Sequence, residues 1–516
     1  MKKYIIIFVI FFSLNSFAQE GFYLLTTMSG DSVGDQFSVV SHIGDVNADG
    51  YDDVIVGAPG GDYAKLFFGS AVFDTIPDLI FRDYKQFNCR FGCSIAGDGD
   101  VNGDGYPDII IGASDTWIGP SCPYECMTTG AAYVYFGGPG IDTTADLTLI
   151  VGSWEDQTGW YYEFGQSVAI IGDVNGDGYD DFAVGAPNDD YDAHGRVYIY
   201  FGGPSVDEQY DVLLEGEDRF DNFGQSISGA GDINKDGFDD LLIGAPHMHV
   251  NPNNPYQYPG KAYLVYGGDE INLANSEVFT GDSLVLNYGR VVAGLGDVNK
   301  NGYPDFGIMA DEYFKIFSGN NFNPILSRYP SRGVGFIGSL YDLNQDGFDD
   351  FVCVSDSVGI YLGKTFLDSM PEFMFSWATP VCYLRNVNGD HHLDIAFAVG
   401  GSWDTRGKVY IYSLDSPDEV KENRDQNISR QIMLYQNYPN PFNSSTIIRY
   451  SIPKQEQVTL KIYDQLGRLV TTLVNGKQNA GEHQVEFHTD ELSSGVYIYK
   501  IQSGDFMSSK KMLLLK

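Results

Sequence analysis

The sequence predicts an all-β protein made of a seven-bladed β-propeller followed by a small C-terminal β-sandwich. Three observations lead to this prediction. One acidic segment recurs seven times, with 44 to 73 residues between successive starts. The chain has 61 glycines in 516 residues and 14% aromatic residues, which favours short strands joined by tight turns. Sustained helical periodicity is absent, so an array of β-sheets is the expected architecture.

The N-terminal segment has the features of a secretory signal peptide. Lys2 and Lys3 precede an apolar run, and Ser16 to Ala18 supply the small residues that signal peptidase prefers. The apolar run is too short to cross a bilayer, and no other stretch reaches the roughly 18 apolar residues required. We therefore expect residues 1–18 to be a signal peptide and the mature protein to be secreted without a transmembrane segment.

Charge divides the chain into two parts. The formal net charge is −39, which excludes a nucleic-acid binder and favours metal cations or neutral partners. Residues 432–516 hold nine Lys/Arg and seven Asp/Glu, a balance of +2, so residues 1–431 carry −41. This difference predicts two domains, at 19–413 and 432–516, joined by a polar linker at 414–431.

Each repeat predicts a meander of four short strands around its acidic segment. In the third unit, Phe164 to Ser167 precede the acidic segment, Val184 to Pro187 follow it, and 211–215 form a fourth strand. The last unit stops after its third strand, at 408–413, whereas a stray strand at 22–27 precedes the first unit. We expect the stray strand to complete the last blade, because this closes the ring and removes an exposed sheet edge.

The acidic segments have the spacing of a loop that binds a hard cation. The pattern Asp-x-Asn-x-Asp-Gly-x-x-Asp places side-chain oxygens at the first, third, fifth and ninth positions and a backbone carbonyl at the seventh, while glycine permits the sharp turn. Calcium takes six to eight oxygens. An EF-hand is excluded, because the twelfth position lacks Glu and a strand follows the last Asp. The predicted ligands are Asp45, Asn47, Asp49, Tyr51, Asp53, Asp100, Asn102, Asp104, Tyr106, Asp108, Asp173, Asn175, Asp177, Tyr179, Asp181, Asp232, Asn234, Asp236, Phe238, Asp240, Asp297, Asn299, Asn301, Tyr303, Asp305, Asp342, Asn344, Asp346, Phe348 and Asp350.

The same segments are open to an interpretation as turns rich in Asp, Asn and Gly, which need no metal. Against this, the seven loops place 19 Asp at ligand positions, and unneutralised carboxylates so close together repel one another. We therefore expect about five to seven calcium ions. The prediction is weaker for two loops: Asn301 replaces an Asp in the fifth, and the seventh begins with Asn386 and has His391 where glycine is expected. An empty seventh loop is compatible with the sequence.

The repeats resemble a known family. The fourth unit runs from Phe223-Gly224-Gln-Ser226 through the acidic loop 232–240 to Gly244-Ala245-Pro246, and this pattern is similar to the FG-GAP repeat of the integrin α-subunit propeller. The resemblance covers roughly residues 22–413. It implies a seven-bladed propeller with calcium in the loop that joins the first and second strands of each blade.

The C-terminal region has a different pattern. Alternating strands at 446–452 and 458–463 predict a small antiparallel β-sandwich. The segments 438–443, 463–468 and 495–500, with the basic ending 510–516, resemble the type A sorting domain of the bacterial type IX secretion system. The resemblance implies the type IX secretion machinery as a partner and export through the periplasm and outer membrane, after which the cargo is anchored at the surface or released. A generic adhesive sandwich is the alternative.

Long insertions collect at the end of the predicted ring opposite the acidic loops, because the turns between strands two and three and between successive blades share that end. These insertions contain the aromatic residues Trp117, Tyr124, Trp154, Trp160, Tyr191, Tyr256 and Tyr258. Exposed aromatics in long loops favour recognition of a protein or glycan ligand, and the integrin resemblance places ligand binding on the same face. The alternative is that they fold back over their own loops.

No catalytic residues can be nominated. Ser94, Ser167 and Ser226 occupy one fixed repeat position and are interpreted as strand residues, and no G-x-S-x-G motif occurs. We expect a recognition or adhesion module and not an enzyme. The alternatives are a calcium-dependent hydrolase or lyase acting on polysaccharide or phospholipid, as in other proteins with this propeller, and a structural surface-layer component.

Cysteine pairing stays open. Cys122 and Cys126 lie in a Pro-rich loop where a small bridge is feasible. Cys89 and Cys93 pair either with that loop or with nothing. Cys353 and Cys382 lie in apolar runs, which suits buried free thiols as well as a disulfide.

Overall fold

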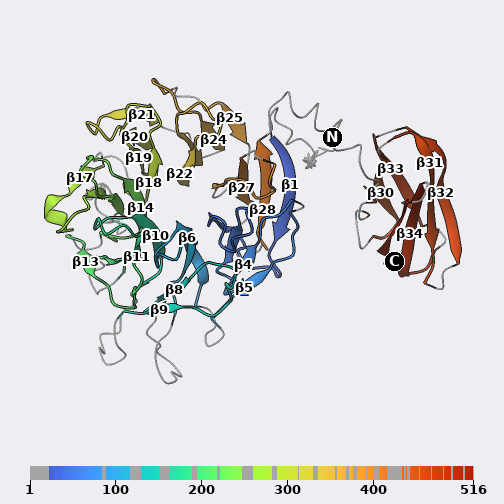
Figure 1. Ribbon diagram of the computed structural model, residues 1–516, viewed down its shortest axis with the longest axis horizontal. Coiled ribbons are helices and arrows are strands. Elements are labelled where there is room, and N and C mark those ends of the chain that lie inside the picture. Colours follow the sequence, from blue (N-terminus) through green and yellow to red (C-terminus); the bar gives the residue numbers. More distant parts are fainter. Residues whose placement is uncertain are drawn as a thin grey trace, which may run out of the picture. The chain divides into compact units, whose positions relative to one another are not determined.

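The fold is described from a computed structural model, shown in Figure 1. The described residues are 22–71, 73–83, 89–116, 129–151, 163–188, 194–217, 221–246, 260–281, 287–311, 313–328, 335–354, 357–367, 371–375, 381–390, 393–399, 406–414, 433–434, 437, 442–452, 454–465, 468–479, 481–489, 492–503 and 506–514. One compact unit spans Phe22–Leu414, and a second contains the strands from Met433 onward.

The first unit is a seven-bladed β-propeller. Its described strands form seven four-stranded antiparallel sheets, each with neighbouring strands adjacent in sequence except at the closing blade. In Figure 1 the first strands β6, β10, β14, β18 and β22 lie around the centre, and the fourth strands lie at the rim. Blades 1 to 3 contain β2 (Val39–His42), β3 (Val54–Ala58), β4 (Tyr63–Phe67), β5 (Leu79–Phe81); β6 (Phe91–Gly99), β7 (Asp108–Ala113), β8 (Ala131–Tyr135), β9 (Leu147–Leu149); and β10 (Ser167–Gly172), β11 (Asp181–Ala186), β12 (Arg196–Tyr200), β13 (Val212–Glu215).

The other four blades repeat this order. Blade 4 contains β14 (Ser226–Gly231), β15 (Asp240–Ala245), β16 (Lys261–Val265) and β17 (Glu277–Thr280); blade 5 contains β18 (Val291–Gly296), β19 (Asp305–Met309), β20 (Phe314–Phe317) and β21 (Pro324–Arg328). Blade 6 contains β22 (Phe336–Tyr341), β23 (Asp350–Val354), β24 (Val358–Tyr361) and β25 (Phe373–Phe375); blade 7 contains β26 (Val381–Leu384), β27 (Asp394–Val399), β28 (Lys408–Leu414) and β1 (Phe22–Ser29).

The core lies between blades. Every residue of the second strands β3, β7, β11, β15, β19 and β23 is buried, which explains why these strands read as continuous apolar runs and not as alternating patterns. Among the described residues, seven buried clusters each join two neighbouring blades, for example Ile43 and Ile55 of blade 1 with Phe91 and Ile109 of blade 2. Each sheet is therefore stabilised on both faces by its neighbours.

Paired glycines allow blades 1 to 4 to approach the following blade closely. A Cβ at Gly112 of β7 would collide with the carbonyl oxygen of Gly165 in blade 3, and Gly57, Gly185 and Gly244 face the next blade in the same way. Gly165 itself has φ of 85°, which favours glycine. The repeated Phe-Gly and Gly-Ala-Pro flanks thus mark the points where two backbones meet.

The ring closes as the sequence predicts. Strand β1 pairs antiparallel with β28 from Phe22 opposite Leu414 to Ser29 opposite Lys408. The sheet order β1-β28-β27-β26 therefore completes blade 7 with the N-terminal strand. The closing seam also has its own buried cluster, in which Met28 and Leu384 pack with Val54 of blade 1.

The second unit is a β-sandwich, as predicted. Its two antiparallel sheets have the orders β29-β30-β33 and β32-β31-β34-β35, and side chains from both sheets form one buried cluster that includes Ile448 and Tyr499. Its strands are β29 (Met433–Leu434), β30 (Ser445–Ile452), β31 (Glu456–Tyr463), β32 (Leu469–Gln478), β33 (Gly481–His488), β34 (Gly495–Ser503) and β35 (Phe506–Leu514).

Helix is almost absent from the part of the chain that the structure describes. The described residues contain one 3-10 turn, Leu273–Asn275, and no helix that is long and apolar enough to span a membrane. Cys89, Cys93, Cys353 and Cys382 are free thiols. Cys122 and Cys126, for which a small bridge was expected to be feasible, lie outside the described residues.

Candidate metal centres

Each acidic loop joins the first and second strands of one blade and is numbered here after that blade. The first loop, from Asp45 to Asp53, leaves β2 and enters β3. Because the first strands of all blades run in the same direction along the propeller axis, the seven loops lie at one end of the ring. The connections between the second and third strands lie at the other end.

Side-chain oxygens organise the first loop. Asp45 accepts hydrogen bonds from the Asp49 N–H at Oδ1 (3.0 Å) and from the Gly50 N–H at Oδ2 (2.8 Å). Asn47 Oδ1 also accepts from the Asp49 N–H, at 2.8 Å, and Asp49 Oδ1 accepts from the Tyr51 N–H, at 3.0 Å. Gly50 has φ of 94°, so the sharp turn at this position favours glycine.

The same arrangement recurs in four other loops. The first-position carboxylate accepts the N–H groups of the fifth and sixth residues in the second, third, fourth and sixth loops. The third-position Asn accepts from the fifth residue in each of them. Five loops therefore share one local structure, built from hydrogen bonds between residues two to five positions apart.

The ninth position places a carboxylate inside the protein. Asp53 is fully buried; its Oδ2 accepts from the Val46 N–H at 3.0 Å, and its Oδ1 accepts from the Gly69 N–H at 2.7 Å. Burial raises the pKa of Asp53 to about 8, and the nearby carboxylates of Asp45 and Asp49 add to the shift, although the two backbone hydrogen bonds oppose it. Burial therefore disfavours the charged form of Asp53, and a nearby cation would favour it.

Equivalent aspartates show the same behaviour in the other loops. Burial raises the pKa of Asp108, Asp181, Asp240, Asp305 and Asp350 to about 7 and that of Asp394 to about 8. All six are fully buried.

The donor types fit a hard divalent cation such as calcium, because positions one, three, five and nine carry only carboxylate or amide oxygens. The side chains are not gathered into a coordination shell, however. Within the described ranges, no three His, Cys, Asp or Glu side chains stand close enough to hold a metal ion, and the Asn47 amide nitrogen donates to Asp49 Oδ2 at 2.9 Å. The ligand assignments therefore stay predictions, supported by residue type and loop shape.

The fifth and seventh loops differ, as the sequence indicates. In the fifth loop, Asn299 donates to the buried Asp305 at 2.7 Å and Asn301 donates to Ser318 Oγ at 2.8 Å, so both amides hydrogen-bond within the blade. In the seventh loop, Asn388 and Asp390 keep the usual pair of contacts, but an Asn stands at the first position. His391 lies outside the described residues.

Sequence reasoning missed a buried histidine beside these loops. His42 ends β2, with Nδ1 3.3 Å from Asp98 Oδ2 and Nε2 3.6 Å from Asp52 Oδ1. Burial opposes protonation of His42, but the two facing carboxylates outweigh it and raise its pKa. The other blades have Gly, Ile, Ser or Tyr at this position of the first strand, so a histidine there was the available signal.

The predicted ligand-binding face is the least described part of the propeller. Trp117, Tyr124, Trp154, Trp160, Tyr191, Tyr256 and Tyr258 all lie outside the described residues. The connections that carry them join β7 to β8, β9 to β10, β11 to β12 and β15 to β16. These connections belong to the end opposite the acidic loops, so the placement of the insertions follows from the topology while the side-chain roles stay predictions.

The repeat-position serines have structural contacts. Ser94 Oγ donates to the Gly165 carbonyl and Ser167 Oγ to the Gly224 carbonyl, each at 2.7 Å, and Ser226 Oγ accepts from the Val292 N–H at 3.1 Å. Each hydroxyl therefore joins one blade to the next, in agreement with their interpretation as strand residues.

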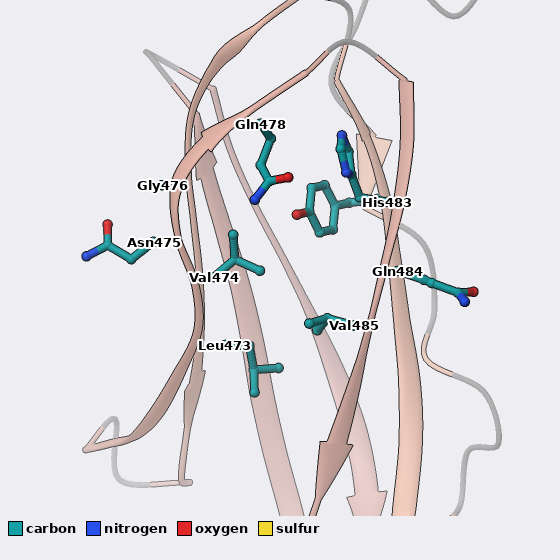
Figure 2. A pocket seen from close by; sticks show the side chains of 9 residues that line it. Leu473, Val474, Asn475, Gly476, Gln478, His483, Gln484 and Val485 are labelled. Atoms are coloured by element: carbon teal, nitrogen blue, oxygen red, sulfur yellow. The ribbon is translucent and has the colours of Figure 1, made fainter.

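A cavity of about 350 Å³ opens in the sandwich between β32 and β33 (Figure 2). Its walls carry Leu473, Val474 and Val485 with neutral polar groups at the margin. His483 stacks on Tyr450 with ring centroids 5.2 Å apart, and its Nε2 lies 2.8 Å from the Asn479 carbonyl oxygen. The lining contains no acid–base pair, so we assign no chemistry to it.

Two family models match the chain. The FG-GAP repeat matches residues 40–72, 91–120, 164–200 and 223–265, which are blades 1 to 4, and the Secretion system C-terminal sorting domain matches residues 436–515. Blades 5 to 7 complete the ring in the structure but lack the Gly-Ala-Pro flank.

Known proteins align with part of the chain. Integrin alpha-5 of Xenopus laevis is 30% identical over 208 residues, covering 39% of this chain and 19% of that protein, and integrin alpha-8 of Mus musculus is 29% identical over 269 residues, covering 49% and 24%. The aligned part thus spans about a quarter or less of these relatives. The solved structure of BBS1N in complex with ARL6DN aligns with 10% identity and a TM-score of 0.46, over 76% of this chain and 97% of that one, a likeness too weak to carry an argument.

The repeats, the closed ring and the C-terminal sandwich agree with the two matches. This chain carries integrin α-like FG-GAP repeats in a seven-bladed β-propeller, together with a sorting domain for type IX export to the cell surface or extracellular space.

Proposed function

We propose that this protein is an extracellular recognition module whose propeller is stabilised by about five to seven calcium ions in the acidic loops. One observation carries the proposal: five loops use the same oxygen-bearing residues and the same hydrogen bonds, and in each of them the ninth-position aspartate is buried. In the first loop the buried carboxylate of Asp53 accepts two backbone N–H groups, and a bound cation would offset the remaining cost of burying its charge.

The first, third, fifth and ninth residues of each loop would hold the ion, with the seventh backbone carbonyl. In the first loop these are Asp45, Asn47, Asp49, Asp53 and Tyr51. Bound calcium would supply the positive charge that allows the buried carboxylate to ionise. The loop's own residues provide oxygen ligands and hold the backbone, and the FG-GAP resemblance implies calcium at the same positions.

Recognition is assigned to the opposite end of the ring. The long insertions between β7 and β8, β9 and β10, β11 and β12, and β15 and β16 carry the aromatic residues that would contact a protein or glycan ligand. In this proposal residues 1–18 form a signal peptide and residues 414–431 form a linker to the sorting domain. We nominate no catalytic residue, and the similarity to integrin α-subunits supports adhesion in preference to hydrolysis.

Calcium titration of the purified full chain after chelation tests the metal assignment. Calorimetry should detect about five to seven ions, and thermal melts should show a higher melting temperature with calcium than with chelator, because an ion that binds only the folded state stabilises it. Magnesium at equal concentration is the control cation. Unchanged melting with no heat of calcium binding would reduce the loops to turn-forming sequence.

A further inference from the structure

Neighbouring acidic loops touch at the eighth loop position, immediately before the buried ninth-position aspartate. The side chain at this position contacts the preceding blade. Asp180 Oδ2, from the third loop, accepts the N–H of Asp100 in the second loop at 2.9 Å. Asp239 Oδ2, from the fourth loop, accepts the N–H of Asp173 in the third loop at 3.1 Å. The first predicted ligand of one loop is thus held by a carboxylate of the next.

Three loops have no aspartate at the eighth position, and the loops that precede them serve as internal comparisons. The eighth position is Pro107 in the second loop, Pro304 in the fifth and Leu393 in the seventh, so no eighth-position carboxylate faces the first, fourth and sixth loops. A different carboxylate, Asp98, lies beside Gly44 next to the first loop, but it already contacts His42 and Arg385. The Pro107 ring faces Gly44, where a Cβ would lie 2.8 Å from it. The position therefore always packs against the preceding loop, but only an Asp adds negative charge.

We propose that the eighth-position aspartates act on the preceding loop as positioning residues and set its calcium affinity, so that the second and third loops are the tightest sites. This inference rests on the proposed function, because it requires calcium in the loops. Asp180 adds a fourth carboxylate beside the three of the second loop, and Asp239 does the same for the third loop. A carboxylate within roughly 6 Å of a divalent ion contributes about ten-fold in affinity even at the dielectric constant of water.

The fifth loop receives partial compensation. It has lost one carboxylate at Asn301, but Asp349 Oδ2 of the sixth loop accepts the Asp297 N–H at 2.7 Å. Its total of three carboxylates then equals that of the first loop. Lys235 of the fourth loop lies over the Tyr303 ring, with Nζ 3.8 Å from the centroid. Its positive charge weakens the negative electrostatic potential of the fifth loop. We place the fifth loop below the first in affinity.

The seventh loop gains little from its neighbour. Asp52 Oδ2 accepts the Asn386 N–H at 3.1 Å, but Asp52 Oδ1 faces the His42 imidazole at 3.6 Å. Arg385 is a cation at the same seam, with Nη2 3.3 Å from Asp98 Oδ2. Because Asp52 already has the His42 side chain as a partner and Asn386 is neutral, the seventh loop is the weakest site.

The test compares calcium calorimetry and melting of the full chain with three single variants. Asp180→Asn keeps an oxygen that accepts the Asp100 N–H but removes the charge. Pro107→Asp adds an eighth-position carboxylate beside the first loop. Asp142→Asn is the matched control, because Asp142 Oδ1 also accepts a backbone N–H, from Thr144 at 2.6 Å, in the exposed connection between β8 and β9.

One site should weaken about ten-fold in Asp180→Asn, one should tighten about ten-fold in Pro107→Asp, and Asp142→Asn should leave all affinities unchanged. In chelator, Asp180→Asn should melt at the same temperature as the unaltered protein or higher, because a like charge has been removed; a merely structural role would lower melting with and without calcium. Calcium binding by the unaltered protein with unchanged affinities in Asp180→Asn overturns this inference alone. Absence of calcium binding by the unaltered protein overturns both proposals.

Discussion

Blades 1 to 4 and blades 5 to 7 share one sheet topology but differ where neighbouring blades meet. In blades 1 to 4 the second strand has glycine at the point of closest approach, whereas the equivalent residues are Met309, Val354 and Ala398 in blades 5, 6 and 7. All seven blade interfaces nevertheless have a buried apolar cluster. Buried apolar clusters are therefore common to all seven interfaces, whereas glycine at this position is confined to blades 1 to 4.

The acidic loops divide along a similar boundary. The first four and the sixth keep the complete pattern, whereas the fifth and seventh have Asn in place of a ligand Asp, so the sixth loop is the exception to this boundary. The FG-GAP family model matches the first four blades, which have both the glycine and the complete loop pattern. The comparison separates the fold of the repeat from its metal affinity. The propeller fold tolerates the loss of the glycine at the blade contact and of a ligand Asp, whereas the calcium affinity of a loop should fall when a ligand Asp is lost.

The largest expected effect is the loss of calcium from all loops together. Five sites that are each occupied at about 100 times their Kd would contribute about 10 kcal/mol or more to the free energy of unfolding.

In chelator, stability should also fall as pH rises. Asp108 ionises near 3.8 in the unfolded chain but near 7 in the fold, so the folded state binds more protons between these values. Thermal melts from about pH 4 to 8 should decline in chelator and stay nearly level in calcium. An equal decline in both would contradict cation neutralisation of the buried carboxylates.

A smaller effect is expected from Gly112→Ala in blade 2. The added methyl group would collide with the Gly165 carbonyl of blade 3, and overpacking of this kind costs about 1–3 kcal/mol. Ala398→Gly, at the equivalent position of blade 7, is the matched variant and should cost about 1 kcal/mol or less through backbone entropy. Urea denaturation of both variants measures the difference. If Gly112→Ala were the milder change, close approach would not explain the glycine.

The smallest effect is expected from Asn301→Asp, which restores the complete pattern in the fifth loop. The change adds one carboxylate near the ion and should tighten one site about ten-fold, or about 1.4 kcal/mol. Ser318 can donate its hydroxyl to the new carboxylate, so the contact with Asn301 at 2.8 Å can be kept. Calorimetry should show the gain without a change in the number of sites. An unchanged isotherm would mean that the fifth loop does not bind calcium in either form.

The sequence by itself determined the features that depend on local structure. The seven acidic loops follow from short-range hydrogen bonds between residues two to five positions apart, such as Asp45 with Gly50. Strand order within each blade follows from the spacing of turns, and closure by β1 follows from counting strands. The C-terminal sandwich was predictable from strands that alternate between buried and exposed residues.

Only the tertiary structure decided which side chains meet across blades. Asp180 and Asp100 are 80 positions apart, and His42 meets Asp98 of the next blade and the Cys382 thiol of the last one. No local periodicity encodes such pairs, because they depend on how neighbouring sheets pack around the ring. The burial of the ninth-position aspartates also comes from this packing, so the sequence predicted their oxygens as ligands but not their raised pKa values.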